Sequence, residues 1–142
     1  MSASDQLELR ITADGPVCLA DASRQLRAFL EQHRVGERAR YAADLALEEL
    51  GTNILGYGFA EGAAAAFRFC VSVDPDQIEL VFEDDGRAFD PTAAPTPRRP
   101  PALEETALGG LGIHMVRQVV AQLHYCRLQQ RNRLVVQITN AA

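Results

Sequence analysis

The first third of the chain changes from a two-residue apolar period to a helical one. Apolar residues alternate with polar ones over residues 7–11, which predicts a half-buried strand. From about residue 19 to residue 35 the apolar positions recur every three or four residues, which predicts a helix. A second helix is predicted from residue 38 to residue 54 or slightly beyond, because a run of glycines follows it.

The middle of the chain contains two more alternating segments and a long proline-rich stretch. Residues 67–73 (FRFCVSV) and 77–84 (QIELVFED) are separated by Asp-Pro-Asp, which predicts an antiparallel hairpin. Residues 86–108 hold five of the seven prolines and show no apolar period. A stretch of this length inside a compact domain is typical of a functional lid or of a disordered segment.

The last third predicts one helix and a second hairpin. The helix is expected from residue 110 to about residue 122, and strands at residues 123–130 and 133–139 are expected to turn at Arg131 and Asn132. The complete order is strand, helix, helix, two strands, lid, helix and two strands. This order predicts an α+β fold, a two-layer sandwich whose helices cover one face of a mixed, mostly antiparallel sheet.

Length and charge limit the class of protein. A chain of 142 residues with 47% hydrophobic content and no repeat or linker predicts a single domain over residues 1–142. The net charge of -5 gives no basic field, so nucleic acid is not expected as a direct partner. The N-terminus lacks the pattern of a signal peptide, and no apolar run is long enough to span a membrane. We therefore expect a cytoplasmic protein.

The three cysteines are widely spaced and lie among apolar residues. Cys18, Cys70 and Cys126 are therefore expected to be reduced thiols packed in the core. No cysteine spacing is typical of a zinc site.

The second predicted helix carries polar residues inside an apolar run. Glu49 and Asn53 lie one turn apart on one face, Gly51 lies between them, and Glu48 is expected to be a solvated neighbour. A glycine inside a helix costs about 1 kcal/mol relative to alanine, so this segment is either a working face or a solvated helix end that frays.

Two further segments place polar or glycine residues beside apolar ones. Glu83, Asp84 and Asp85 end a predicted strand just before Gly86, which makes either an ordinary turn or a fixed acceptor at the edge of a pocket.

The other segment contains Gly109, Gly110 and Gly112, at the start of the third helix. They make either a tight turn or a phosphate site formed by helix amides. The segment matches neither GxxxxGK[ST] nor GxGxxG.

Together, the three polar segments supply what a nucleotide with a metal ion requires. Asn53 can ligate Mg²⁺ through its amide oxygen, and Asp84 can accept a hydrogen bond from a base amine. The glycine turn can hold phosphates, and Glu49 lies one helical turn from the predicted metal ligand. The sequence therefore predicts a nucleotide site.

Three motifs in this order resemble those of the GHKL (histidine kinase-like) ATPase superfamily. EELGTN is similar to its N box, DDGRAFDP to its G1 box and GGLGIHMV to its G2 box. The short chain, FDP and GGLGIHMVR most resemble the anti-sigma factor serine/threonine kinases of the RsbW and SpoIIAB type. The resemblance implies a Bergerat-type ATP-binding fold with an ATP lid at about residues 86–108.

The resemblance also implies a role for each matched residue. Asn53 would coordinate Mg²⁺ between the phosphates of ATP, and Glu49 would be the general base. Asp84 would accept a hydrogen bond from the adenine amine, and Gly86 would leave room for the base. Gly109, Gly110 and Gly112 would form the phosphate-binding turn next to the lid.

The implied activity is that of an ATP- and Mg²⁺-dependent protein serine/threonine kinase. Its substrate would be an anti-anti-sigma protein of the STAS type, a sigma factor would be a second partner, and the protein would form a homodimer. An alternative is a binding module in which nucleotide orders the lid and switches affinity for a sigma factor or another regulator without efficient phosphotransfer. Retention of both Glu49 and Asn53 favours the enzyme.

Overall fold

The fold is taken from a computed structural model, which describes residues 6–60, 62–93 and 110–140. These residues form five strands, three α-helices and one short 3-10 helix. In chain order they are β1 (Gln6–Thr12), α1 (Leu19–Gln32), α2 (Glu37–Tyr57), β2 (Ala66–Val73), β3 (Gln77–Asp84), η2 (Pro91–Ala93), α4 (Gly110–Val119), β4 (Gln122–Leu128) and β5 (Arg131–Thr139).

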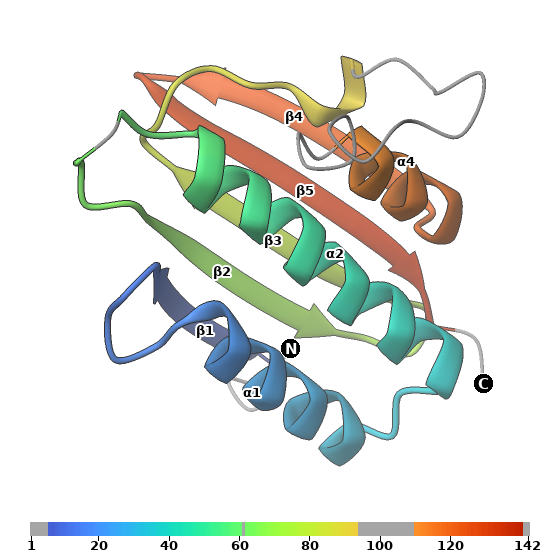
Figure 1. The fold of residues 1–142 in the computed structure, drawn as a ribbon. Helices are drawn as coiled ribbons and strands as arrows, with labels where there is room; N and C mark the ends of the chain where they lie inside the picture. Colours follow the sequence, from blue (N-terminus) through green and yellow to red (C-terminus); the bar gives the residue numbers. More distant parts are fainter. Residues whose placement is uncertain (1–5, 61, 94–109, 141–142) are drawn as a thin grey trace.

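The strands form one sheet in the order β1-β2-β3-β5-β4. All four pairings between these strands are antiparallel, so the sheet is more uniform than the mixed sheet expected from the sequence. All three α-helices lie on the same face of the sheet, with α2 running along its middle (Figure 1). The predicted α+β two-layer fold is confirmed.

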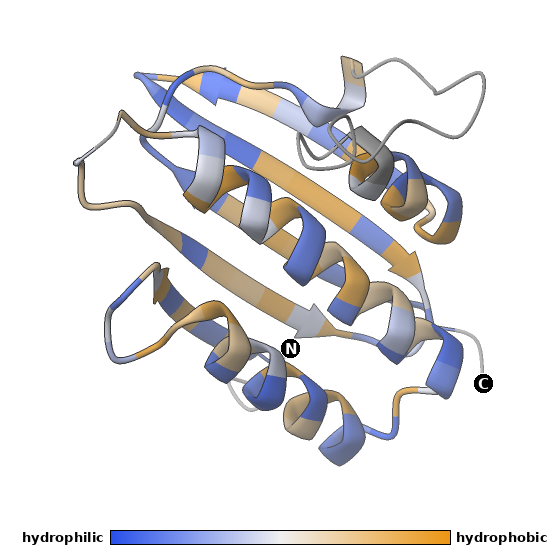
Figure 2. Cartoon of the chain, in the orientation of Figure 1, coloured by the Kyte–Doolittle hydropathy of each residue, from blue (hydrophilic) through white to orange (hydrophobic). Residues whose placement is uncertain are grey.

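The core lies between α1, α2 and the covered face of the sheet. Strict alternation in β3 turns every second side chain towards the helices, and Ile78, Leu80 and Phe82 are buried there. In Figure 2 the middle of β5 and parts of the helices are hydrophobic, while other segments of the same helices are hydrophilic. Burial of the apolar side chains between the helices and the sheet is the main stabilising contribution to such a two-layer fold.

Gly51 has a packing role inside α2. A Cβ at this position would lie 2.8 Å from Leu19 Cδ1 and 3.1 Å from Phe67 Cζ, which is closer than ordinary contact. Glycine therefore allows α2 to approach both α1 and β2. The glycine that interrupts the apolar run is explained by helix packing against the sheet.

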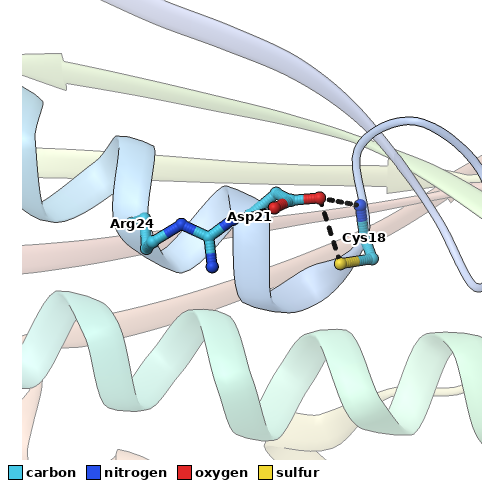
Figure 3. Close-up of polar contacts among 3 residues, drawn as sticks. All are labelled: Cys18, Asp21 and Arg24. Atoms are coloured by element: carbon cyan, nitrogen blue, oxygen red, sulfur yellow. Dashed lines mark hydrogen bonds and ion pairs between the residues drawn. The ribbon is translucent and has the colours of Figure 1, made fainter.

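Helix α1 begins with hydrogen bonds between Cys18, its N-cap residue, and Asp21 in its first turn. The Asp21 carboxylate accepts from the Cys18 backbone N–H at 3.4 Å and from its thiol at 3.2 Å (Figure 3). These hydrogen bonds, followed by the nearby Arg24, lower the pKa of Asp21. Asp21 therefore stabilises the first turn through its ionised form.

The expectation that all three cysteines pack in the core is wrong for Cys126. It is exposed on β4, while Cys18 and Cys70 are partly buried, and all three are free thiols. Cys126 lies in a strand at the edge of the sheet, and its side chain alternates with those of Leu123 and Tyr125, which pack against the core.

Two helices end earlier than the apolar period predicts. Helix α1 stops at Gln32 because Arg34 adopts a left-handed conformation with φ of 56°. Helix α4 stops at Val119, since the backbone N–H of Ala121 already donates to Gln137 of β5 at 2.8 Å.

The final hairpin turns at Gln129 and Gln130, which have φ of 53° and 64°. The predicted turn at Arg131 and Asn132 is therefore wrong, and both residues belong to β5. Among the described residues, no helix combines the length and the apolar character that crossing a membrane requires.

Candidate functional site

A cavity of about 230 Å³ lies between the C-terminal half of α2 and the sheet. On the sheet side it is bordered by the C-terminal end of β3, the first residues of β5 and Tyr125 of β4. Its wall is mostly apolar, and its polar side chains come from different elements. The lining residues are Leu50, Asn53, Ile54, Tyr57, Gly58, Phe82, Asp84, Arg87, Ala88, Phe89, Pro91, Tyr125, Asn132 and Leu134. A small cavity with a few convergent polar groups is typical of a ligand site.

Helix α2 contributes Asn53 to this cavity and places Glu49 one turn earlier. The buried Asn53 donates from Nδ2 to the backbone carbonyl of Glu49 at 3.0 Å. This bond uses the amide nitrogen and leaves the amide oxygen as the acceptor of the side chain. Glu48, the neighbour predicted to be solvated, is exposed.

The Glu49 carboxylate lies against the first turn of α4. A Cβ on Gly112 would stand 2.8 Å from Glu49 Cδ and would overlap its carboxylate oxygen. Partial burial, followed by the like charge of Glu48, raises the pKa of Glu49. The predicted base and the predicted glycine turn are thus adjacent, although neither lines the cavity.

Asp84 ends β3 as a buried carboxylate at the cavity wall. Its Oδ1 accepts from the backbone N–H of Gly86 at 2.8 Å and from Asn132 Nδ2 at 3.0 Å. No other described group donates to this carboxylate, so one oxygen is fully engaged and Oδ2 is left as an acceptor. A carboxylate held in this way can read a single donor on a ligand.

Asn132 is a site residue that the sequence did not indicate. The register of β5 against β3 pairs it with Asp84, and the side chain of Asn132 is buried. Its Nδ2 also donates to the Arg87 carbonyl at 2.8 Å, and its Oδ1 accepts from the Tyr125 hydroxyl at 2.5 Å and from Arg127 Nη1 at 2.9 Å. Because asparagine favours turns, the sequence predicts a loop position for this residue. In the structure it is instead a residue of strand β5.

The sequence of this chain matches the Histidine kinase-like ATPase domain model over residues 12–138. The chain belongs to the histidine kinase-like ATPase family. It is also 30% identical over 135 residues to the serine/threonine-protein kinase BtrW of Bordetella bronchiseptica, covering 95% of this chain and 93% of that protein. The resemblance carried by the three motifs is therefore confirmed at the level of the family.

Membership of this ATPase family implies that the domain binds ATP, because ATP is the ligand of such domains. Together with the similarity to a protein kinase, it supports an ATP-binding, kinase-like function. The predicted site residues of this histidine kinase-like ATPase fall into two groups. Asn53 and Asp84 line one cavity, whereas Glu49 and Gly112 meet beside it.

The remaining predicted glycines of the ATPase domain are placed differently. A Cβ on Gly86 would overlap the carbonyl oxygen of Gly58 at the end of α2, and the Arg87 N–H donates to the same oxygen at 2.8 Å. Gly86 therefore permits close approach of two backbones. Gly110 is the first residue of α4, while Gly109 and residues 94–108 of the predicted lid lie outside the described residues.

The described part of the ATPase domain contains no group of three histidine, cysteine or acidic side chains that could hold a metal ion by itself. Mg²⁺ in phosphate-transfer sites is commonly held by one or two protein oxygens together with phosphates and water. The amide oxygen of Asn53, left over after its nitrogen binds Glu49, fits that requirement.

Proposed function

We propose that the chain is an ATP- and Mg²⁺-dependent protein serine/threonine kinase that phosphorylates a serine of an anti-anti-sigma partner of the STAS type. The observation that carries this proposal is the position of the Glu49 carboxylate. It lies against Gly112 at the start of α4 and one turn from Asn53 on α2. This arrangement supports a site in which Glu49 as base, the start of α4 as phosphate-binding turn and Asn53 as metal ligand act together.

Each residue of the site has a defined task in this reaction. Asp84 accepts a hydrogen bond from the adenine amine, and the apolar wall formed by Leu50, Ile54 and Leu134 excludes water from the base. The amides of Gly110 and Gly112, with Gly109 before them, bind phosphate oxygens at the positive end of α4. Gly86 keeps the turn after β3 close to α2.

Glu49 acts on the protein substrate. Its carboxylate accepts the proton of the serine hydroxyl while the serine oxygen forms a bond to the γ-phosphorus. The bond from that phosphorus to the bridging oxygen breaks, and ADP leaves. The raised pKa of Glu49 makes it a stronger proton acceptor than an ordinary glutamate. Asn53 would hold Mg²⁺, which when bound neutralises charge on the phosphates.

The family resemblance supports a class of partner and an assembly for this chain. A sigma factor is proposed as the second partner, sequestered by a homodimer of this chain, and partners of these classes would place the protein in the cytoplasm. The net charge of -5 agrees with a protein that binds regulators and not nucleic acid.

The proposal is tested by incubating the protein with ATP labelled at the γ-phosphate and with an anti-anti-sigma protein encoded beside it. Transfer of label to one serine, absent when that serine is replaced by alanine, is the expected result. Nucleotide-dependent capture of the partner without any label transfer would instead establish the binding module. Absence of ATP binding in the presence of Mg²⁺ would refute both functions.

A further inference from the structure

Asn132 has every hydrogen-bonding group of its side chain engaged. An asparagine amide offers two N–H donors and two acceptor lone pairs. Its donors go to Asp84 Oδ1 at 3.0 Å and to the Arg87 carbonyl at 2.8 Å. Its oxygen accepts from the Tyr125 hydroxyl at 2.5 Å and from Arg127 Nη1 at 2.9 Å. The amide therefore has one orientation, fixed from both sides.

The same group of residues holds the turn that follows β3. Arg127 donates a further hydrogen bond to the Gly86 carbonyl at 3.0 Å, next to the Arg87 carbonyl that Asn132 binds. Two consecutive carbonyls after β3 are thereby tied to β4 and β5. Arg87, Ala88 and Phe89 of this turn line the cavity together with Asp84.

The pairing with Asn132 determines what Asp84 can offer to a ligand. Because the Asn132 amide and the Gly86 N–H both donate to Oδ1, that oxygen is engaged, and Oδ2 is the carboxylate oxygen left to accept a hydrogen bond from a ligand. A pure acceptor favours a base with an exocyclic amine over one with a carbonyl at the same position. Adenine has such an amine, whereas hypoxanthine has the carbonyl.

We propose that Asn132 is the positioning residue of the base subsite: it fixes the Asp84 carboxylate and the turn at Gly86 and Arg87, and so determines the preference for a 6-amino purine. This inference rests on the proposed binding of ATP. Tyr125 and Arg127 hold the oxygen of Asn132, and Arg127 also holds the Gly86 carbonyl directly.

The substitution Asn132→Asp tests this role with little change in shape. A carboxylate keeps the acceptor for Tyr125 and Arg127 but removes both donors, and it sets a negative charge beside Asp84 Oδ1. The Kd for ATP should rise about 10- to 100-fold, as expected for the loss of hydrogen bonds to a charged group. The Kd for inosine triphosphate, which lacks the amine, should rise less. The ratio of the Kd for inosine triphosphate to the Kd for ATP should therefore fall towards one.

Asn140→Asp provides the matched control. Asn140 follows the same strand at the opposite end of the sheet, where its Nδ2 donates to the Asp74 carbonyl at 2.8 Å in an exposed position. This variant should keep the wild-type Kd for both nucleotides. Tyr125→Phe is the milder second variant, and it should raise the Kd for ATP about threefold with little change for inosine triphosphate.

The possible results separate the inference from the proposed function. An unchanged ATP Kd in Asn132→Asp, or equal weakening of both nucleotides in Asn132→Asp and in Tyr125→Phe, would overturn the positioning role and leave ATP binding intact. A wild-type protein that binds neither nucleotide would overturn the proposed function, and this inference with it.

Discussion

The two ends of the candidate site are built in different ways. At the α2 end, Glu49 and Asn53 are four residues apart on one helix, and the hydrogen bond from Asn53 Nδ2 runs to the Glu49 carbonyl. At the sheet end, Asp84 and Asn132 are 48 residues apart and meet only because β3 pairs with β5. One end is set by local helix geometry and the other by strand register.

This difference predicts how each end responds to substitution. The Glu49 side chain is partly exposed and lies outside the apolar core, so changing it should alter chemistry with little change in the fold. Asp84 and Asn132 are buried and hydrogen-bonded to each other, so changing either should alter binding and cost some stability. Substitutions at the two ends should therefore separate turnover from affinity.

The largest effect is expected for Glu49→Gln. Loss of a positioned general base should lower kcat for phosphotransfer about 10²- to 10⁴-fold, while the Kd for ATP stays close to the wild-type value. Single-turnover phosphorylation of the partner and calorimetric titration with ATP measure the two quantities. Glu48→Gln is the control, because it removes the same charge from the exposed neighbouring position. Wild-type turnover in Glu49→Gln would remove Glu49 from the reaction.

Asp84→Asn should produce the opposite separation. An amide can accept from Gly86 and Asn132 only if its NH2 group takes the place of the free carboxylate oxygen, where it would face the adenine amine as a second donor. The Kd for ATP should rise about 10- to 100-fold, with kcat at saturating ATP changed only a few-fold. Asp85→Asn, at the exposed next residue, should leave both values unchanged. A loss in kcat alone would contradict the division between the two ends.

The helical end of the site is more accessible from the sequence than the sheet end. Positions four apart on a predicted helix share a face, so their spacing alone is enough to pair Glu49 with Asn53. The order of the elements, the helices on one face and the acidic end of β3 also follow from apolar period and turn residues. These features depend on short-range rules.

Asn132 could not be found by the same rules. Asparagine favours turns, and placing the hairpin turn at Arg131 and Asn132 satisfies that preference. The true turn at Gln129 and Gln130 lies two residues earlier, a displacement that keeps Leu134 on the buried face. The apolar alternation therefore fits both registers, and only the pairing with β3 distinguishes them. The packing role of Gly51 is hidden for a similar reason, since it depends on Leu19 and Phe67.

Gly112→Ala should have an intermediate effect on the α2 end. The added methyl would overlap the Glu49 carboxylate and displace it, which should lower kcat about tenfold. In the Glu49→Gln background the same substitution should cause little further loss, because the displaced group no longer acts as a base. Gly56→Ala is the control, since a methyl there meets nothing within 4 Å. Equal losses in both backgrounds would show that Gly112 acts independently of Glu49.

The smallest expected effect is the pH dependence of stability that Glu49 introduces. Its folded-state pKa is raised above the ordinary value of 4.5 by burial and by Glu48, so the folded protein disfavours the ionised form. Below the unfolded-state pKa the carboxyl is protonated in both states and costs nothing. As the pH rises through the folded-state pKa, the ionised carboxylate lowers the free energy of unfolding by its full amount. This loss should stay under about 1 kcal/mol, because solvent screens the partly exposed group.

Urea unfolding of Glu49→Gln and wild type as a function of pH measures this cost. The variant should match the wild type in acid and exceed it in free energy of unfolding near pH 7, whereas Glu48→Gln should show a smaller gain. The activity of the wild type should fall in acid at a higher pH than an ordinary glutamate would give, since only the ionised carboxylate can accept the serine proton. A variant that is less stable than wild type at neutral pH would mean that the Glu49 carboxylate, placed beside Gly112, stabilises the contact between α2 and α4.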